Sequence, residues 1–155
     1  VEGPHFEKVK SFIAITEQEG GKLVQGGKIH SDLGSGWYIE PTIFDNVTAD
    51  MTLFQQEVFG PILAVTTFTS DEEAVVLANN SSYGLAASLY TESLKRAQRV
   101  SRAIRAGTVS INGFSEGDIT TPFGGFKQSG FGGRDKGLEA LQQYVQTKTI
   151  WYVQD

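Results

Sequence analysis

The fold class is decided by residues 61–111, which run PILAVTTFTSDEEAVVLANNSSYGLAASLYTESLKRAQRVSRAIRAGTVSI. This stretch contains three β-prone runs, at Pro61–Phe68, Leu85–Tyr90 and Thr108–Ile111. Ser70 and Glu73 form a capping box that predicts a helix start, and Thr91 is a candidate cap for a second helix. Because strands that alternate with helices are typical of βαβ units, the stretch predicts an α/β fold with a parallel sheet.

The residues before this stretch predict a helix and two further strands. Gly3 and Pro4 favour a helix start, and Gly20-Gly21 is expected to end it. Apolar side chains repeat at helical spacing between these points, at Phe6, Val9 and Ile13. The expected strands are Lys22–Val24 and Tyr38–Phe44, the second interrupted by a proline. With its length of 155 residues, the chain is expected to form one domain.

A glycine-rich connection, residues 112–137, follows the last strand of the deciding stretch. It contains eight glycines and shows neither a helical nor a strand period. Ligands of open parallel sheets bind beyond the carboxyl ends of the strands, so this connection is a candidate site. A disordered insertion is the alternative, but the connection carries large apolar residues, among them Pro122, Phe123, Phe126 and Phe131. A helix at about Lys136–Tyr144 and a closing strand at Thr147–Val153 are expected after it.

Composition and charge exclude several classes of function. Thirteen basic and eighteen acidic residues give a net charge of −5, which argues against general affinity for nucleic acid or an anionic membrane. The chain has no cysteine, so disulfides, thiolate metal sites and a cysteine nucleophile are excluded within it. The two histidines, His5 and His30, lie far apart in sequence, and we expect no metal site. No apolar run approaches the length of a membrane span, and a cytoplasmic protein is expected.

Neither the glycines nor the basic residues give a strong signal for nucleotide or nucleic-acid binding. The glycines match neither a Walker loop nor a complete GxGxxG fingerprint. The helix expected after Thr91 carries five basic residues, Lys95, Arg96, Arg99, Arg102 and Arg105. Such a face can bind phosphate groups, but a solvated amphipathic helix explains it as well. A generic anion- or nucleic-acid-binding domain rests on this face alone.

Seven segments together resemble the aldehyde dehydrogenase superfamily. They are GPHFEKVKSFI (3–13), GWYIEPTIF (36–44), EVFGPILAV (57–65), NNSSYGLAASLYT (79–91), AGTVSING (106–113), TPFGGFKQSGFGGRDKGLEAL (121–141) and TKTIW (147–151). Their order is that of the family, and they cover essentially the whole chain, which resembles the final third of a member. Residues 116–141 with the following KTIW are most similar to bacterial ω-aminoaldehyde dehydrogenases, including the γ-glutamyl-γ-aminobutyraldehyde enzymes of putrescine catabolism.

The resemblance implies the parallel-sheet catalytic domain of the aldehyde dehydrogenase fold for residues 1–145. It implies an oligomerisation strand for residues 146–155. Pairing of Thr147–Val153 with a neighbouring subunit would give a homodimer or homotetramer. The alternative for this strand is an edge position in the sheet of its own domain, where an exposed aromatic strand favours association.

The resemblance also implies NAD or NADP as the cofactor. Glu57 matches the family glutamate that holds the nicotinamide ribose, and Phe59 matches the aromatic residue beside the nicotinamide. His5 and Lys8 match positions on the first helix that touch the adenosine half, although glutamine is frequent in the family at the position of His5. By composition alone, Glu57 is expected to be a surface carboxylate and Phe59 a core residue.

Three residues match the family's substrate-binding region. Phe123 matches an aromatic residue of the aldehyde tunnel, and Glu116 and Gly117 occupy the stretch that varies with the substrate. Many relatives have a large aromatic residue where Gly117 stands. Glycine here, between Glu116 and Asp118, predicts a wide and acidic tunnel mouth that favours an aldehyde with an amine or amide group.

The family's cysteine nucleophile, general-base glutamate and oxyanion-hole asparagine lie upstream of this region, so no catalytic residue is expected here. The chain is therefore expected to be a C-terminal fragment, inactive alone, of an NAD(P)-dependent enzyme that oxidises a small-molecule aldehyde to a carboxylic acid. The alternative is a non-catalytic module, related to the family, for oligomerisation or regulation. Glu57 and Phe59 favour the enzyme, whereas the absence of cysteine favours the module.

Overall fold

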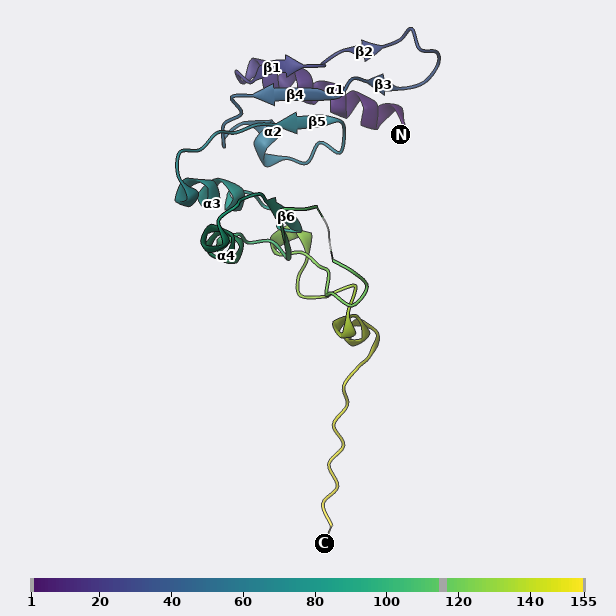
Figure 1. Cartoon of the computed structure of the whole chain (residues 1–155). Helices are drawn as coiled ribbons and strands as arrows, with labels where there is room; N and C mark the ends of the chain where they lie inside the picture. The colour runs from purple at the N-terminus through teal and green to yellow at the C-terminus, as the bar shows by residue number, and fades with distance from the viewer. Residues whose placement is uncertain (1, 115–116, 155) are drawn as a thin grey trace. The chain divides into compact units, whose positions relative to one another are not determined.

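The computed structural model describes residues 2–114 and 117–154, which divide into two units, one ending at Ser81 and the other beginning at Ser82 (Figure 1). The sequence predicts a single domain, whereas each strand pair of the structure forms within one unit. The alternation of strands and helices predicts which elements exist, but no pattern along the chain says which strands share hydrogen bonds.

The first unit contains a three-stranded sheet and a long helix. The helix α1 spans Gly3–Gln18, and the strands are β1 (Lys22–Gln25), β4 (Thr42–Asp45) and β5 (Ile62–Ala64). The strand order is β1-β4-β5, with β1 antiparallel and β5 parallel to β4. The apolar face of α1 packs against the sheet in a core made of Val9, Phe12, Ile13, Phe44, Val47, Met51, Leu53 and Val58. Because β4 begins only at Thr42, the expected strand over Tyr38–Phe44 is interrupted, as its proline predicts.

Three smaller elements complete this unit. A two-stranded antiparallel ribbon is formed by β2 (Ile29–His30) and β3 (Tyr38–Ile39), of which only β3 falls within an expected strand, that over Tyr38–Phe44. A short helix, α2 (Thr52–Gln55), precedes β5. Helix α3 (Asp71–Asn79) begins after Ser70, whose hydroxyl accepts a hydrogen bond from the Glu73 amide at 3.1 Å. The Ser70 cap of the predicted capping box is thereby confirmed, while the Glu73 carboxylate reaches back to the amide of Thr69, one residue before the cap, at 2.7 Å.

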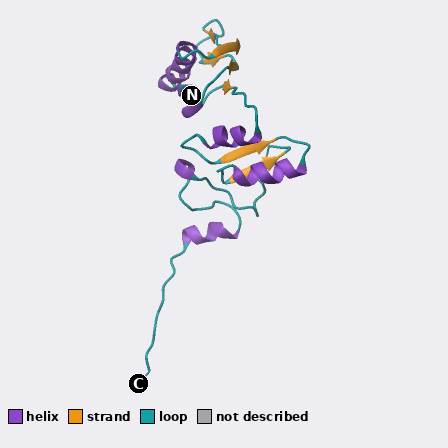
Figure 2. Ribbon diagram, turned by 90° about the vertical axis from the view of Figure 1, so that its left-hand side faces the viewer, coloured by secondary structure: helices purple, strands orange, loops and turns teal. Residues whose placement is uncertain are grey.

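The second unit is built on one βαβ arrangement. Strands β6 (Ala86–Leu89) and β7 (Thr108–Ile111) are parallel, and helix α4 (Leu94–Ala103) connects them (Figure 2). The helix cap is Ser93 rather than the expected Thr91, because the Ser93 hydroxyl accepts the Arg96 amide at 3.3 Å. The two parallel strand pairs, one in each unit, confirm the predicted α/β class.

The C-terminal elements differ from the prediction. The helix expected at about Lys136–Tyr144 is a 3₁₀ helix, η2 (Leu138–Tyr144), and it has no buried side chain to stabilise an α-helix. A short 3₁₀ helix, η1 (Lys127–Ser129), interrupts the glycine-rich connection. Residues 146–154 form neither helix nor strand, so the closing strand is not an edge of this chain's own sheet (Figure 1). A strand requires a hydrogen-bonding partner, and the described residues provide none for this segment.

Over residues 2–114 and 117–154, no helix combines the length and the apolar character that crossing a membrane requires.

Candidate functional site

The segment Glu57–Gly60 lies between α2 and β5 in the first unit. Val58 is buried in the core of this unit, with 7% of its surface exposed, while the Phe59 ring is 75% exposed and Glu57 is also at the surface. Because Val58 takes the buried position, its two neighbours face solvent. The surface position predicted for Glu57 is confirmed, and the core position predicted for Phe59 from composition is wrong.

Two side chains of α1 hold the backbone of this segment. The Nε2 atom of His5 lies 2.8 Å from the Phe59 carbonyl oxygen, and the Nζ atom of Lys8 donates to the Glu57 carbonyl oxygen at 3.2 Å. A carbonyl oxygen only accepts, so Nε2 of His5 carries the hydrogen in this bond. The His5 ring also meets the Phe59 ring edge-on, with centroids 6.5 Å apart.

The backbone of the segment runs directly against the helix. Phe59 has φ 60°, a left-handed conformation that is unusual for an aromatic residue. At Gly60 an added Cβ would lie 2.7 Å from Cγ1 of Val9, so only glycine permits this approach. Over the described residues, the Glu57 carboxylate has no hydrogen-bond or ion-pair partner within the chain.

An apolar pocket of about 220 Å³ opens beside the same segment. Its lining includes His5, Phe6, Trp37, Ile39, Phe59 and Pro61. The rings of Phe6 and Trp37 contact each other at a tilt of 39°, with centroids 4.9 Å apart. An exposed ring therefore borders an apolar pocket, and an exposed carboxylate lies two residues before that ring, an arrangement that suits a ligand with hydroxyl groups and a flat ring.

The predicted substrate-binding residues belong to the second unit, except Glu116, which lies outside the described residues. Gly117 and Thr121 line an open cleft of about 480 Å³ along β7. Phe123 is half-buried, and the Lys136 ammonium lies 5.2 Å from the centre of its ring. The structure thus brings Glu57, Phe59, His5 and Lys8 together in one unit and places Gly117 and Phe123 in the other.

Asp118 organises a tight turn after Gly117. Its carboxylate accepts the Thr120 amide at 2.7 Å and the Thr120 hydroxyl at 2.5 Å, and its own amide donates to the Thr121 hydroxyl at 2.8 Å. The hydrogen bond from the Thr120 hydroxyl is the main cause that lowers the pKa of Asp118 below its usual range. Asp118 therefore has a structural role in addition to the acidic character expected of it.

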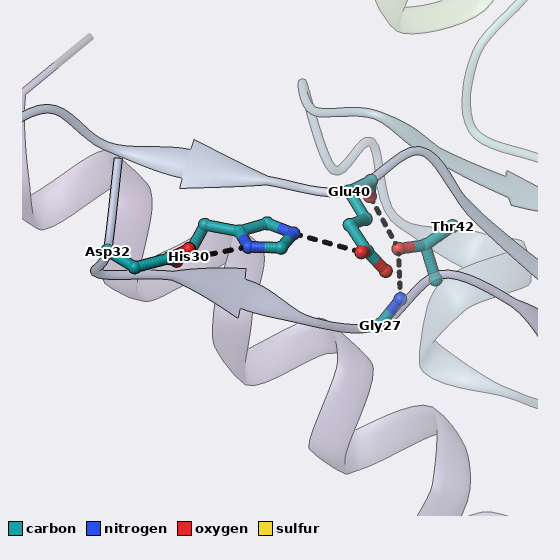
Figure 3. Close-up of polar contacts among 5 residues, drawn as sticks. All are labelled: Gly27, His30, Asp32, Glu40 and Thr42. Carbon is teal, nitrogen blue, oxygen red and sulfur yellow. Dashed lines mark hydrogen bonds and ion pairs between the residues drawn. The ribbon is translucent and has the colours of Figure 1, made fainter. Parts of the chain in front are cut away.

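The first unit also contains a polar network that sequence reasoning missed (Figure 3). His30 on β2 contacts Glu40 through Nε2 at 2.9 Å and Asp32 through Nδ1 at 3.2 Å. Thr42 accepts the Gly27 amide at 2.9 Å and donates to the Glu40 carbonyl at 2.8 Å. No sequence pattern connects these residues, because the β2–β3 ribbon brings them together. Within the described ranges, no group of acidic, histidine or cysteine side chains could hold a metal ion.

The basic face of α4 has a simple structural explanation. Four basic residues of the helix, Lys95, Arg96, Arg99 and Arg102, are exposed, as is Arg105 just after it, while Ala97 and Val100 on the opposite face are buried. This arrangement fits the solvated amphipathic helix that the sequence offered as one of two alternatives.

Comparison with known proteins identifies the relatives of this chain. The aldehyde dehydrogenase family model matches residues 1–150. Aminoacetaldehyde dehydrogenase of Pseudomonas aeruginosa is 50% identical over 147 residues, which cover 95% of this chain and 29% of that protein. The NADP/NAD-dependent aldehyde dehydrogenase PuuC of Escherichia coli is 48% identical over the same length and coverage.

Solved structures agree with these sequence matches. An indole-3-acetaldehyde dehydrogenase in complex with NAD⁺ superposes with a TM-score of 0.92 at 46% identity, over 97% of this chain and 30% of that one. The aldehyde dehydrogenase KauB of Pseudomonas aeruginosa gives a TM-score of 0.91 at the same identity and coverage. The chain spans less than a third of the length of these relatives. It belongs to the aldehyde dehydrogenase family.

Proposed function

We propose that this chain contributes the nicotinamide-riboside contact and part of the aldehyde site to an NAD(P)-dependent aldehyde dehydrogenase. The enzyme oxidises an aldehyde to a carboxylic acid. The chain belongs to the aldehyde dehydrogenase family. Within it, the observation that carries the proposal is that Glu57 and Phe59 lie at the surface, on either side of the buried Val58. At these positions the Glu57 carboxylate and the Phe59 ring are accessible to a ligand.

The residues of the first unit fit NAD or NADP. The Glu57 carboxylate has two oxygens that can accept both hydroxyls of a ribose, and the exposed Phe59 ring provides a flat apolar surface for the adjoining base. When bound, the nicotinamide ring supplies the hydride acceptor of the reaction. This chain's part is to bind and orient that half of the cofactor. The NAD⁺ complex of the indole-3-acetaldehyde relative supports this choice of cofactor.

We further propose an ω-aminoaldehyde substrate, such as γ-glutamyl-γ-aminobutyraldehyde. The name of the Pseudomonas relative, aminoacetaldehyde dehydrogenase, supports this class. Gly117 has no side chain to fill the cleft along β7, and Phe123 provides an apolar ring that helps exclude water. Substituting Glu116→Gln should raise the KM for cationic aldehydes more than that for neutral ones. Equal changes for both would contradict an acidic entrance.

Self-association belongs to the same proposal. The segment Thr147–Val153 has strongly exposed side chains at Ile150, Trp151, Tyr152 and Val153, and we propose that it pairs with a second subunit to form a homodimer or homotetramer. A cytoplasmic location is also proposed, and cell fractionation tests it.

The test uses the protein purified from its natural source, with its intact mass measured first. Glu57→Gln should weaken NAD⁺ binding about tenfold or more in calorimetry, because a charge-assisted pair of hydrogen bonds is lost. The matched control is Glu17→Gln, a substitution on the exposed surface of α1 that should leave affinity unchanged.

Equal affinities for Glu57→Gln and the unsubstituted protein would contradict the proposed cofactor contact. The 155 residues alone contain no cysteine and should not oxidise aldehydes by a thiolate mechanism. A natural mass near 16.9 kDa without NAD⁺ binding would favour the non-catalytic module instead.

A further inference from the structure

We propose that His5 and Lys8 are positioning residues, which hold the backbone of the Glu57–Gly60 segment so that Glu57 and Phe59 face the nicotinamide-riboside half of the cofactor. The inference rests on the proposed function, since it concerns the same site. It assigns to His5 and Lys8 a role different from the adenosine contact that the family resemblance implies. That contact stays a prediction, and the experiment below separates the two roles.

The first argument is that one helix face meets one loop at three successive points. His5, Lys8 and Val9 follow each other at the i, i+3 and i+4 positions of α1, which share a face. His5 binds the Phe59 carbonyl, Lys8 binds the Glu57 carbonyl, and Val9 packs against Gly60. The loop is therefore fixed along its length and not at a single atom.

The second argument concerns what these bonds leave free. The carbonyl oxygens of Glu57 and Phe59 point toward α1 and are occupied by the two side chains. The side chain between them, Val58, is buried in the core. The remaining groups of the segment, the Glu57 carboxylate and the Phe59 ring, are the exposed ones.

The third argument is the left-handed backbone of Phe59. An aromatic residue with φ 60° is held there only when its surroundings supply compensating interactions. The bond from Nε2 of His5 is made to the carbonyl of this same residue, and the two rings also touch edge-on. His5 thus stabilises the conformation that turns the Phe59 ring outward.

The fourth argument is that both side chains are already engaged within the chain. Besides its 3.2 Å bond to Glu57, the Lys8 ammonium lies 5.8 Å from the centre of the Phe12 ring. His5 donates through Nε2 and is half-buried. A side chain used in this way affects the cofactor through the loop that it holds.

The experiment compares His5→Leu and Lys8→Met in the protein purified in its natural full-length form. His5→Gln and Lys8→Arg restore a donor at each position. Lys10→Met is the matched control because Lys10, on the same helix, pairs with Glu7 at 3.4 Å. Two readouts that need no turnover are measured for every variant. They are hydrogen exchange of the amides at 58–60 without ligand, and calorimetric affinities for nicotinamide mononucleotide and for AMP.

We expect His5→Leu and Lys8→Met to speed amide hydrogen exchange in this segment and to weaken the binding of nicotinamide mononucleotide roughly tenfold. The affinity for AMP should change less than about twofold. The donor-restoring variants should recover both values, and Lys10→Met should change neither. Unchanged exchange and unchanged mononucleotide affinity would overturn the inference. So would a loss of AMP affinity alone, which would show direct adenosine contacts.

Glu57→Gln separates this inference from the proposed function. If that variant binds nicotinamide mononucleotide as well as the unsubstituted protein does, the proposed site is wrong and the positioning role fails with it. If Glu57→Gln weakens the binding of nicotinamide mononucleotide while His5→Leu and Lys8→Met do not, the proposed site is right and only the positioning role is wrong.

Discussion

Nε2 of His5 and the carbonyl oxygen of Phe59, 54 residues apart in sequence, are joined by a 2.8 Å hydrogen bond. The bond connects the first turn of α1 to the loop before β5. Because Phe59 has a left-handed backbone, this contact joins a helix to a residue whose conformation is itself unfavourable. Several measurable consequences concern this loop and the other irregular segments of the chain.

The left-handed backbone of Phe59 predicts that glycine stabilises the protein more than alanine does at this position. Phe59→Gly and Phe59→Ala both remove the ring, so their difference isolates the backbone. Glycine should give the higher free energy of unfolding, by about 1 kcal/mol, because alanine pays the left-handed penalty. Urea denaturation of the two variants measures this difference. A more stable alanine variant would show that Phe59 is not left-handed in solution.

Gly117 should tolerate substitution less well than another glycine with positive φ. At Gly117, with φ 79°, an added Cβ would lie 2.4 Å from the Thr121 hydroxyl, whereas Gly34, with φ 105°, has no atom within 4 Å of that position. Gly117→Ala should therefore displace Thr121 and release the Asp118 amide bound to it. Hydrogen exchange of the Asp118 amide should accelerate in Gly117→Ala and stay unchanged in Gly34→Ala. Equal exchange in both variants would contradict the turn geometry.

The β2–β3 ribbon should be more stable in mildly acidic solution. The hydrogen bond that His30 donates to Glu40 is the largest of the interactions that raise the pKa of His30 above 6.5, followed by the one it donates to Asp32. The folded ribbon therefore binds the proton more tightly than the unfolded chain does. This stabilisation is fully present below pH 6.5 and is lost as the pH rises through the raised pKa.

A titration of the His30 ring by NMR checks this prediction. We expect a midpoint above 6.5 in the unsubstituted protein and a midpoint closer to that value in Glu40→Gln, which keeps the size of the side chain but removes its charge. Cross-strand signals of His30 and Tyr38 should weaken over the same pH range. A midpoint at or below 6.5 would mean that the ion pairs do not persist in solution.

The exposed C-terminal segment predicts association through backbone hydrogen bonds. Ile150→Pro removes an amide hydrogen from the proposed strand and should shift the purified natural protein to smaller species in sedimentation velocity. Ile150→Thr keeps both the amide and a β-branched side chain, and it should leave the assembly intact. If the proline variant assembles like the unsubstituted protein, residues 147–153 do not pair between subunits.

Local patterns determined the class of this fold and the family of the chain. The capping box at Ser70 and the β-prone runs before and after α4 depend on residues close in sequence, so they could be recognised without coordinates. Composition likewise indicated Glu57 as a surface carboxylate, and that position is confirmed.

The tertiary structure alone decided the division into two units, the outward turn of the Phe59 ring and the pairing of His30 with Glu40. It also placed His5 and Lys8 against the carbonyls of a loop about fifty residues away. Each of these features depends on contacts between distant parts of the chain. Helical and strand periodicity record only which face of an element is apolar, and they carry no information about which distant backbone group will meet it.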